Sequence, residues 1–152
     1  MSRKVISGKE ILMECTLCNS INEEFRVLCS DKYSVCILNK NPLKEGHVMV
    51  LPKRHVIDLT ELSEKESKSL LDMTEKILIA LKKTYWKDPI VEMNTGKWSS
   101  QSHLHLHVLP SEGSLRHLIS RYEGFEFKGA DEIEPISKEE GVRIRDKIKK
   151  YV

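Results

Sequence analysis

The sequence feature that most constrains the fold is residues 103–107, where histidine and leucine alternate as His-Leu-His-Leu-His. Successive side chains of a β-strand point to opposite faces, so this alternation predicts a strand over residues 103–109. The leucines and Val108 would pack into a core, while the three imidazoles would line an accessible face. Pro110 would end the strand, because proline cannot donate a hydrogen bond to a sheet ladder.

The spacing of the histidine row favours an extended substrate over a single metal ion. A strand rises about 3.3 Å per residue, so the backbone positions of His103 and His107 would lie roughly 13 Å apart. All three imidazoles could not comfortably bind one ion, although two neighbours could. Imidazole suits phosphoryl or nucleotidyl transfer, because a neutral histidine attacks through one nitrogen while a hydrogen bond at the other fixes its tautomer. Plain surface histidines, or half of a metal site, are the alternatives.

The remaining pattern predicts an α+β domain with an antiparallel sheet covered on one side. Ser63 and Glu66 fit a capping box, which indicates the start of a helix with one apolar stripe. The expected strands cover residues 33–39, 47–51, 90–93 and 103–109, and the expected helices cover residues 63–81 and 137–151.

The composition is that of one globular domain rather than a disordered chain. The 152 residues suit a single domain, which we expect to have its core in residues 15–110 and an extension over residues 111–152. A net charge of +2, from 25 basic and 23 acidic residues, gives no support for nucleic-acid binding. No apolar run approaches the roughly 18–20 residues that span a bilayer, and the N-terminus lacks a signal-peptide core. These observations predict a cytoplasmic protein.

Together these motifs resemble the histidine-triad (HIT) family, in its branch of fragile-histidine-triad and dinucleoside polyphosphate hydrolases. Residues 103–109 match its signature of three histidines separated by single apolar residues and followed by two more. The strand-turn-strand of residues 38–52 and the following Lys53-Arg54-His55 also agree, so the resemblance covers about residues 15–110. It implies a HIT-like fold, with an antiparallel sheet of about five strands, a long helix on one face, a C-terminal helix, and a homodimer.

The resemblance also implies a role for each residue of the site. His105 would be the nucleophile that takes up a nucleoside monophosphate, and His107 would contact the α-phosphate. His47 and His103 would position this pair. Asn39 matches the family position that holds the ribose hydroxyls. Further phosphate and ribose contacts would come from Asn94, Ser99, Ser100 and Gln101. In that loop the sequence departs from the family, because the glutamine lies only two residues before the first histidine.

The activity implied by the resemblance is that of a nucleotide hydrolase or transferase. It would cleave at the α-phosphorus of a purine nucleotide conjugate through a covalent nucleotidyl-histidine intermediate, and catalysis would need no metal. Dinucleoside polyphosphates, phosphoramidates and adenylates are the candidate substrates. Two alternatives stay open: a HIT-fold protein that binds purine nucleotides without turnover, and a zinc-stabilised structural protein.

A separate motif, Cys15-Thr-Leu-Cys18, has the spacing of half a tetrahedral zinc site. Reduced structural thiols or a redox pair fit this spacing about as well. In some triad-family proteins and their relatives, two histidines complete such a pair, and by position these would be His55 and His103. Zinc held by four protein ligands would be structural, because no coordination position stays open for water.

Overall fold

The computed structural model describes residues 3–6, 9–12, 15–95, 99, 101–111, 137, 139 and 142. The chain divides into two compact units, Met1–Glu112 and Gly113–Val152. The first unit contains the strands β1 (Arg3–Ile6), β2 (Lys9–Leu12), β3 (Val27–Ser30), β4 (Ser34–Leu38), β5 (Val48–Pro52), β6 (Pro89–Glu92) and β7 (Leu106–Pro110), the helices α1 (Thr16–Ser20) and α2 (Glu64–Tyr85), and two short 3-10 helices, η1 (Glu24–Arg26) and η2 (Leu59–Glu61). Of the predicted C-terminal helix, only positions 137, 139 and 142 lie within the described residues.

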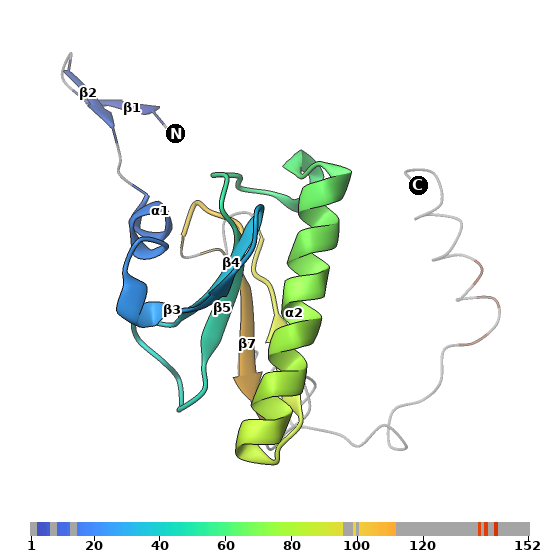
Figure 1. Ribbon diagram of the computed structural model, residues 1–152. Coiled ribbons are helices and arrows are strands. Elements are labelled where there is room, and N and C mark those ends of the chain that lie inside the picture. Colours follow the sequence, from blue (N-terminus) through green and yellow to red (C-terminus); the bar gives the residue numbers. More distant parts are fainter. Residues whose placement is uncertain are drawn as a thin grey trace. The chain divides into compact units, whose positions relative to one another are not determined.

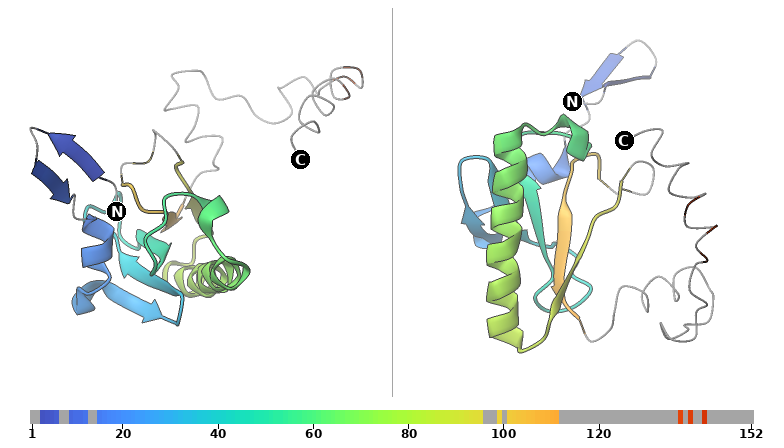
Figure 2. Two further views of the ribbon diagram at one scale, coloured as in Figure 1. Left: turned by 90° about the horizontal axis from the view of Figure 1, so that it is seen from above. Right: turned by 90° about the vertical axis from the view of Figure 1, so that its right-hand side faces the viewer.

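Five of the strands form one antiparallel sheet in the order β3-β4-β5-β7-β6, and β1 pairs separately with β2. This confirms the predicted α+β class and its five-stranded sheet. The predicted hairpin is formed by β4 and β5, which pair from Ser34 with Pro52 to Leu38 with Val48. Figures 1 and 2 show α2 along one face of the sheet and the short α1 on the other side.

Helix α2 begins at the predicted capping box. The Ser63 hydroxyl accepts from the backbone N–H of Glu66, and the Glu66 carboxylate accepts from the backbone N–H of Ser63 at 2.8 Å. The helix buries its apolar stripe, Leu70, Met73, Ile77 and Leu81, against Cys36, Val48, Val50, Leu106 and Val108 of the sheet. None of the helices among the described residues is long and apolar enough to cross a membrane.

The opposite face of the sheet carries a smaller apolar cluster. Leu17 of α1 packs there with four residues of β4 and β5, namely Val35, Ile37, Met49 and Leu51. Because Cys15 caps α1 and Cys18 lies in it, this packing brings the N-terminal thiols to the same face of the sheet as His107, whose partner in the β5–β7 ladder is Met49.

Strand β7 begins at Leu106, three residues later than the predicted start at residue 103. Two hydrogen bonds explain the difference. The backbone N–H of Leu104 donates to the Val56 carbonyl at 2.7 Å, outside the sheet ladder. The carbonyl of Pro52 lies 2.9 Å from the His103 side chain. The predicted alternation nevertheless holds, because Leu104, Leu106 and Val108 are all in the core packed against α2.

Candidate functional site

The histidines gather where β5 and β7 lie side by side. His47 directly precedes β5, and His107 lies in β7, so the pairing of these strands brings together two residues that are 60 positions apart. The centroids of the His47 and His107 rings are 5.1 Å apart, and those of His105 and His107 are 4.7 Å apart. The structure therefore places His47, His105 and His107 in one continuous cluster.

A chain of hydrogen bonds fixes the tautomers of two of these histidines. The backbone N–H of Leu43 donates to Nδ1 of His47 at 3.1 Å, so neutral His47 carries its proton on Nε2. That nitrogen lies 2.9 Å from Nδ1 of His107 and donates to it. His107 therefore carries its own proton on Nε2, which leaves an N–H donor on the side of the ring away from His47.

Burial keeps these two rings neutral near pH 7. Desolvation lowers the pKa of His47. Desolvation, together with the neighbouring imidazoles of His105 and His47, lowers the pKa of His107 to about 4. A neutral His107 is what the hydrogen-bond chain requires, since a doubly protonated ring could not accept at Nδ1.

His105 has the arrangement expected of a nucleophile. Its Nδ1 lies 2.7 Å from the backbone carbonyl oxygen of His103, to which only an N–H can donate. The proton is thereby fixed on Nδ1, and Nε2 carries the lone pair. His103, two positions earlier in the chain, thus sets the tautomer of His105 through its backbone carbonyl.

The prediction that all three imidazoles line an accessible face is wrong for two of them. His103 is fully buried and His105 is 3% exposed, whereas His107 is half-buried. His103 is buried because its ring points toward Cys15 and Cys18 at α1. The strand pattern alone did not predict that this N-terminal segment packs over the ring.

Asn39, predicted to hold the ribose, lies at the end of β4 beside His47. Its Oδ1 accepts from the backbone N–H of Asn41 at 2.8 Å, which turns its Nδ2 toward Nε2 of His47 at 3.3 Å. Both nitrogens carry protons in the tautomer described above, so this contact is not a hydrogen bond. The amide N–H groups of Asn39 can then donate to a bound ligand.

The loop before the triad is described in part. Asn94 is half-buried shortly after β6, and Ser100 lies outside the described residues. The hydroxyl of Ser99 donates to the Gln101 carbonyl at 2.6 Å, while Oε1 of Gln101 accepts from the Thr16 hydroxyl of α1. The side-chain oxygen of Gln101 is thus already used to hold the loop against α1.

A second cluster contains the four residues predicted as metal ligands, Cys15, Cys18, His55 and His103. One ligand atom from each lies within 4.8 Å of all the others. Nδ1 of His103 is 3.5 Å from Sγ of Cys15 and 3.4 Å from Sγ of Cys18, and Nδ1 of His55 is 3.3 Å from Sγ of Cys18. The structure thus brings the cysteine pair of the motif together with the two histidines that the family resemblance implied.

The geometry of the cluster fits a tetrahedral ion. With ordinary Zn–S and Zn–N bonds, the sulfur-to-nitrogen edge of such a site is about 3.6 Å, close to the observed distances. Nε2 of His103 donates to the Pro52 carbonyl, which directs the lone pair of Nδ1 at the cysteines, as is usual for metal-binding histidines. Burial and the Cys15 thiol raise the pKa of Cys18 to about 11, so an ion bound here would displace a proton.

Several groups that shape the site were missed by sequence reasoning. The Leu43 N–H and the carbonyls of Pro52 and His103 are main-chain atoms, which any residue could supply, so the sequence holds no signal for them. Arg26 is the exception, because it stands as a lone cation in the apolar stretch Phe-Arg-Val-Leu-Cys. It is 4% exposed and contacts the end of β4.

An antiparallel sheet with three alternating histidines that lead into one strand and a fourth histidine directly before the neighbouring strand defines a class of proteins, those of the histidine-triad type. The model of the HIT domain family matches residues 21–114, more than half of the chain, and the chain belongs to this family.

Proteins that are similar in sequence agree with this assignment. An uncharacterized HIT-like protein of Mycobacterium tuberculosis is 33% identical over 103 residues, which cover 64% of this chain and 72% of that protein. The AP-4-A phosphorylase of the same bacterium is 33% identical over 103 residues, which cover 65% of this chain. The match spans 53% of the phosphorylase, about half its length.

Solved structures share the fold. A HIT family protein of Bacillus anthracis superposes with a TM-score of 0.69 at 22% identity, covering 92% of this chain and 98% of that one. A zinc-bound histidine triad family protein of Mycobacterium smegmatis superposes with a TM-score of 0.59 at 22% identity, covering 91% and 95%.

Proposed function

We propose that this protein is a nucleotide hydrolase or transferase that acts at the α-phosphorus of a purine nucleotide conjugate. The observation that carries the proposal is the hydrogen bond from Nδ1 of His105 to the His103 carbonyl, which leaves Nε2 of His105 as a nucleophile of fixed tautomer. His107, with an N–H donor on its Nε2, would lie beside it to bind a phosphate oxygen.

The proposed reaction has two steps. Nε2 of His105 forms a bond to the α-phosphorus while the bond from phosphorus to the leaving group breaks. The leaving group departs with the electron pair and takes its proton from solvent, while the N–H on Nε2 of neutral His107 donates to a phosphate oxygen. In the second step water attacks phosphorus and the P–N bond breaks, so that Nε2 of His105 regains its lone pair and the proton of the water passes to solvent. The His103 carbonyl accepts from Nδ1 throughout, which stabilises the positive charge on His105 while it is nucleotidylated.

Membership of the HIT family supports this assignment, as does the similarity to the AP-4-A phosphorylase. Dinucleoside polyphosphates are therefore the first substrates to examine, followed by phosphoramidates and adenylates. Asn39 would donate to the ribose, and Asn94, Ser99, Ser100 and Gln101 would contribute further contacts to ribose and phosphate. Membership of the HIT family also supports the proposal that the protein is a homodimer. Light scattering after gel filtration measures its oligomeric state.

Single-turnover kinetics with a diadenosine polyphosphate and an adenosine phosphoramidate test the proposal. The wild-type protein should yield a peptide containing residue 105 that is heavier by one adenylyl group in mass spectrometry. His105→Asn should abolish this adduct and lower turnover by several orders of magnitude while AMP binding persists. Equal turnover in the variant would refute the nucleophile. Binding without turnover in the wild type would instead identify a nucleotide-binding protein.

We further propose that Cys15, Cys18, His55 and His103 hold a structural zinc ion. The ion would cross-link α1 to the segments that carry the two histidines, and all its ligands would come from the protein. Support comes from the donor set and its distances, and from the zinc-bound relative of Mycobacterium smegmatis.

Metal analysis of protein purified without added zinc tests this site. We expect one zinc per chain in the wild type and none in Cys18→Ser. Cys29→Ser is the matched control, because Cys29 is a half-buried thiol that contacts Met73 and lies outside the cluster. Zinc-free wild-type protein that keeps its melting temperature would refute a structural role.

A further inference from the structure

Arg26 is a buried cation far from any sequence motif. Only 4% of it is exposed, although it directly precedes the edge strand β3. Burying a guanidinium is costly unless its N–H groups are hydrogen-bonded, so a buried arginine indicates a specific set of acceptors.

Its acceptors lie on three different segments. Nε and one terminal nitrogen both donate to the Leu38 carbonyl, at 3.0 and 2.8 Å. The other terminal nitrogen donates to the Ser20 hydroxyl at 2.9 Å and to the Glu23 carboxylate at 3.1 Å. Arg26 thus joins the end of β4 to the end of α1.

The position of the Leu38 carbonyl explains why a side chain is needed there. The β3–β4 ladder ends where Val27 pairs with Ile37, so no β3 residue is left to pair with Leu38. The guanidinium of Arg26 takes the place of the missing strand and satisfies this carbonyl with two N–H groups that converge on its one oxygen.

The Leu38 carbonyl and the Asn39 N–H belong to one peptide unit, and both ends of this unit are held. Arg26 binds the carbonyl, and the N–H donates to the His47 carbonyl at 3.0 Å. Because the peptide unit is planar, fixing it at both ends sets the position of Cα of Asn39 and the direction of its N–Cα bond. The bond from the Asn41 N–H to Oδ1 of Asn39 then orients the side chain about this fixed backbone.

We propose that Arg26 is a positioning residue that orients Asn39, and that it thereby sets the preference of this protein for ribose over deoxyribose nucleotides. The inference rests on the proposed function, in which Asn39 donates to the ribose hydroxyls. Arg26 itself does not touch the ligand: it acts through the peptide unit between Leu38 and Asn39.

The test compares kcat/KM for adenosine 5′-phosphoramidate with kcat/KM for its 2′,3′-dideoxy counterpart. In Arg26→Met, which keeps the length of the side chain and removes its donors, the preference for the ribose substrate should fall at least ten-fold, mainly through KM. Arg26→Lys, with one point donor, should give an intermediate preference. Asn39→Ala should lose the preference, and adding Arg26→Met to it should change the ratio no further.

Arg54→Met is the matched control. Arg54 also binds a carbonyl and a carboxylate, those of Glu61 and Glu66, but it does so at the start of α2. Its loss should lower the melting temperature and leave the ribose preference within two-fold of the wild type. A merely structural role for Arg26 would give this same pattern in Arg26→Met and would overturn the proposal.

A measurement that needs no turnover separates this inference from the proposed function. In the NMR spectrum of the full-length protein, the side-chain amide resonances of Asn39 should shift in Arg26→Met and Arg26→Lys and stay unchanged in Arg54→Met. If the wild type neither turns over nor binds adenosine nucleotides, the proposed function fails while this shift still tests the contact. Unchanged Asn39 resonances in both Arg26 variants would refute the positioning role.

Discussion

His103 serves two clusters through different atoms. Its ring faces Cys15 and Cys18, whereas its backbone carbonyl accepts from Nδ1 of His105. A change in the side chain therefore removes one proposed metal ligand while the carbonyl group itself remains. The first histidine of the row is thus a link between the thiol cluster and the proposed nucleophile rather than a third phosphate contact.

His107 should make the stability of the protein depend on pH. Its pKa is lowered to about 4 by burial and by neighbouring imidazoles, against about 6.5 for an exposed histidine. Between these values the unfolded chain binds a proton that the folded chain does not, so the free energy of unfolding rises with pH. The contribution is complete above about pH 6.5 and is lost as the pH falls toward 4.

Urea denaturation at several pH values between 4.5 and 7 measures this dependence. His107→Asn should show a shallower fall in the free energy of unfolding than the wild type, because the titrating group is gone. His47 also has a lowered pKa, so part of the dependence on pH should remain in the variant. Identical slopes would show that His107 keeps an ordinary pKa.

At the level of elements, the capping box of α2 should contribute measurably to stability. Ser63→Ala removes the acceptor for the Glu66 N–H and should lower the free energy of unfolding by about 1 kcal/mol. Ser67→Ala, one turn further along the same helix, is the control and should be neutral or slightly stabilising, because alanine is the best helix former. Chemical denaturation measures the free energy of unfolding of both variants. Equal losses in the two variants would contradict a contribution from the capping box.

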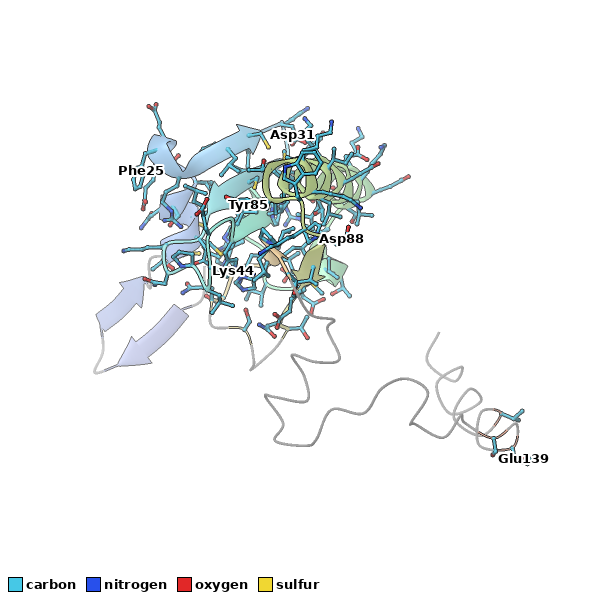
Figure 3. All side chains as sticks on the ribbon, turned by 90° about the horizontal axis from the view of Figure 1, so that it is seen from below. Phe25, Asp31, Lys44, Tyr85, Asp88 and Glu139 are labelled. Atoms are coloured by element: carbon cyan, nitrogen blue, oxygen red, sulfur yellow. The ribbon has the colours of Figure 1, made fainter. Side chains whose placement is uncertain are left out.

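The turn before β5 depends on a glycine. Gly46 has a φ of +84°, and a Cβ there would lie 2.6 Å from Cε2 of Tyr85 and 2.9 Å from Cγ of Pro110. Figure 3 shows Tyr85 at the same end of the molecule as Lys44 of this turn. Gly46→Ala should therefore lower stability by about 1–3 kcal/mol, from backbone strain and overpacking.

Thermal unfolding of Gly46→Ala measures this cost. Adding Tyr85→Ala to it should recover only part of the loss, because the positive φ and the contact with Pro110 remain. Full recovery in the double variant would mean that the backbone conformation carries no strain.

The elements with strong local signals were predictable from the sequence. The hairpin of β4 and β5 and the capped helix α2 follow from alternation, a turn and a capping box, and the structure confirms them. Strand β3 and helix α1 are only four and five residues long, too short for a periodic signal. The late start of β7 was not predictable, because it depends on a hydrogen bond from His103 to the main chain of Pro52.

At the level of the whole molecule, the site was foreseen only where a motif marks it. The resemblance to the HIT family named His47, His105 and His107, and the structure brings them together. The cysteine pair could be recognised from its spacing, but its histidine partners came from the resemblance alone. The sequence marks Arg26 as a lone cation in an apolar stretch, but it does not predict the role of this residue, since its acceptor at Leu38 exists only because the β3–β4 ladder ends one residue earlier.

The division of the chain into two units predicts that the first folds without the second. A protein ending at Glu112 should unfold cooperatively and bind the same amount of zinc as the full chain, because the sheet, α1 and α2 all lie within residues 1–112. Circular dichroism and metal analysis of this truncated protein check the expectation. Loss of cooperative unfolding would show that residues 113–152 belong to the core domain.

The contact between His47 and His107 has a consequence for the timing of folding. It joins two strands whose histidines are 60 residues apart, so the chain must close a long loop before the contact forms. During synthesis the β4–β5 hairpin and α2 are made before β7. The histidine cluster can therefore assemble only after β7 has been made and has paired with β5.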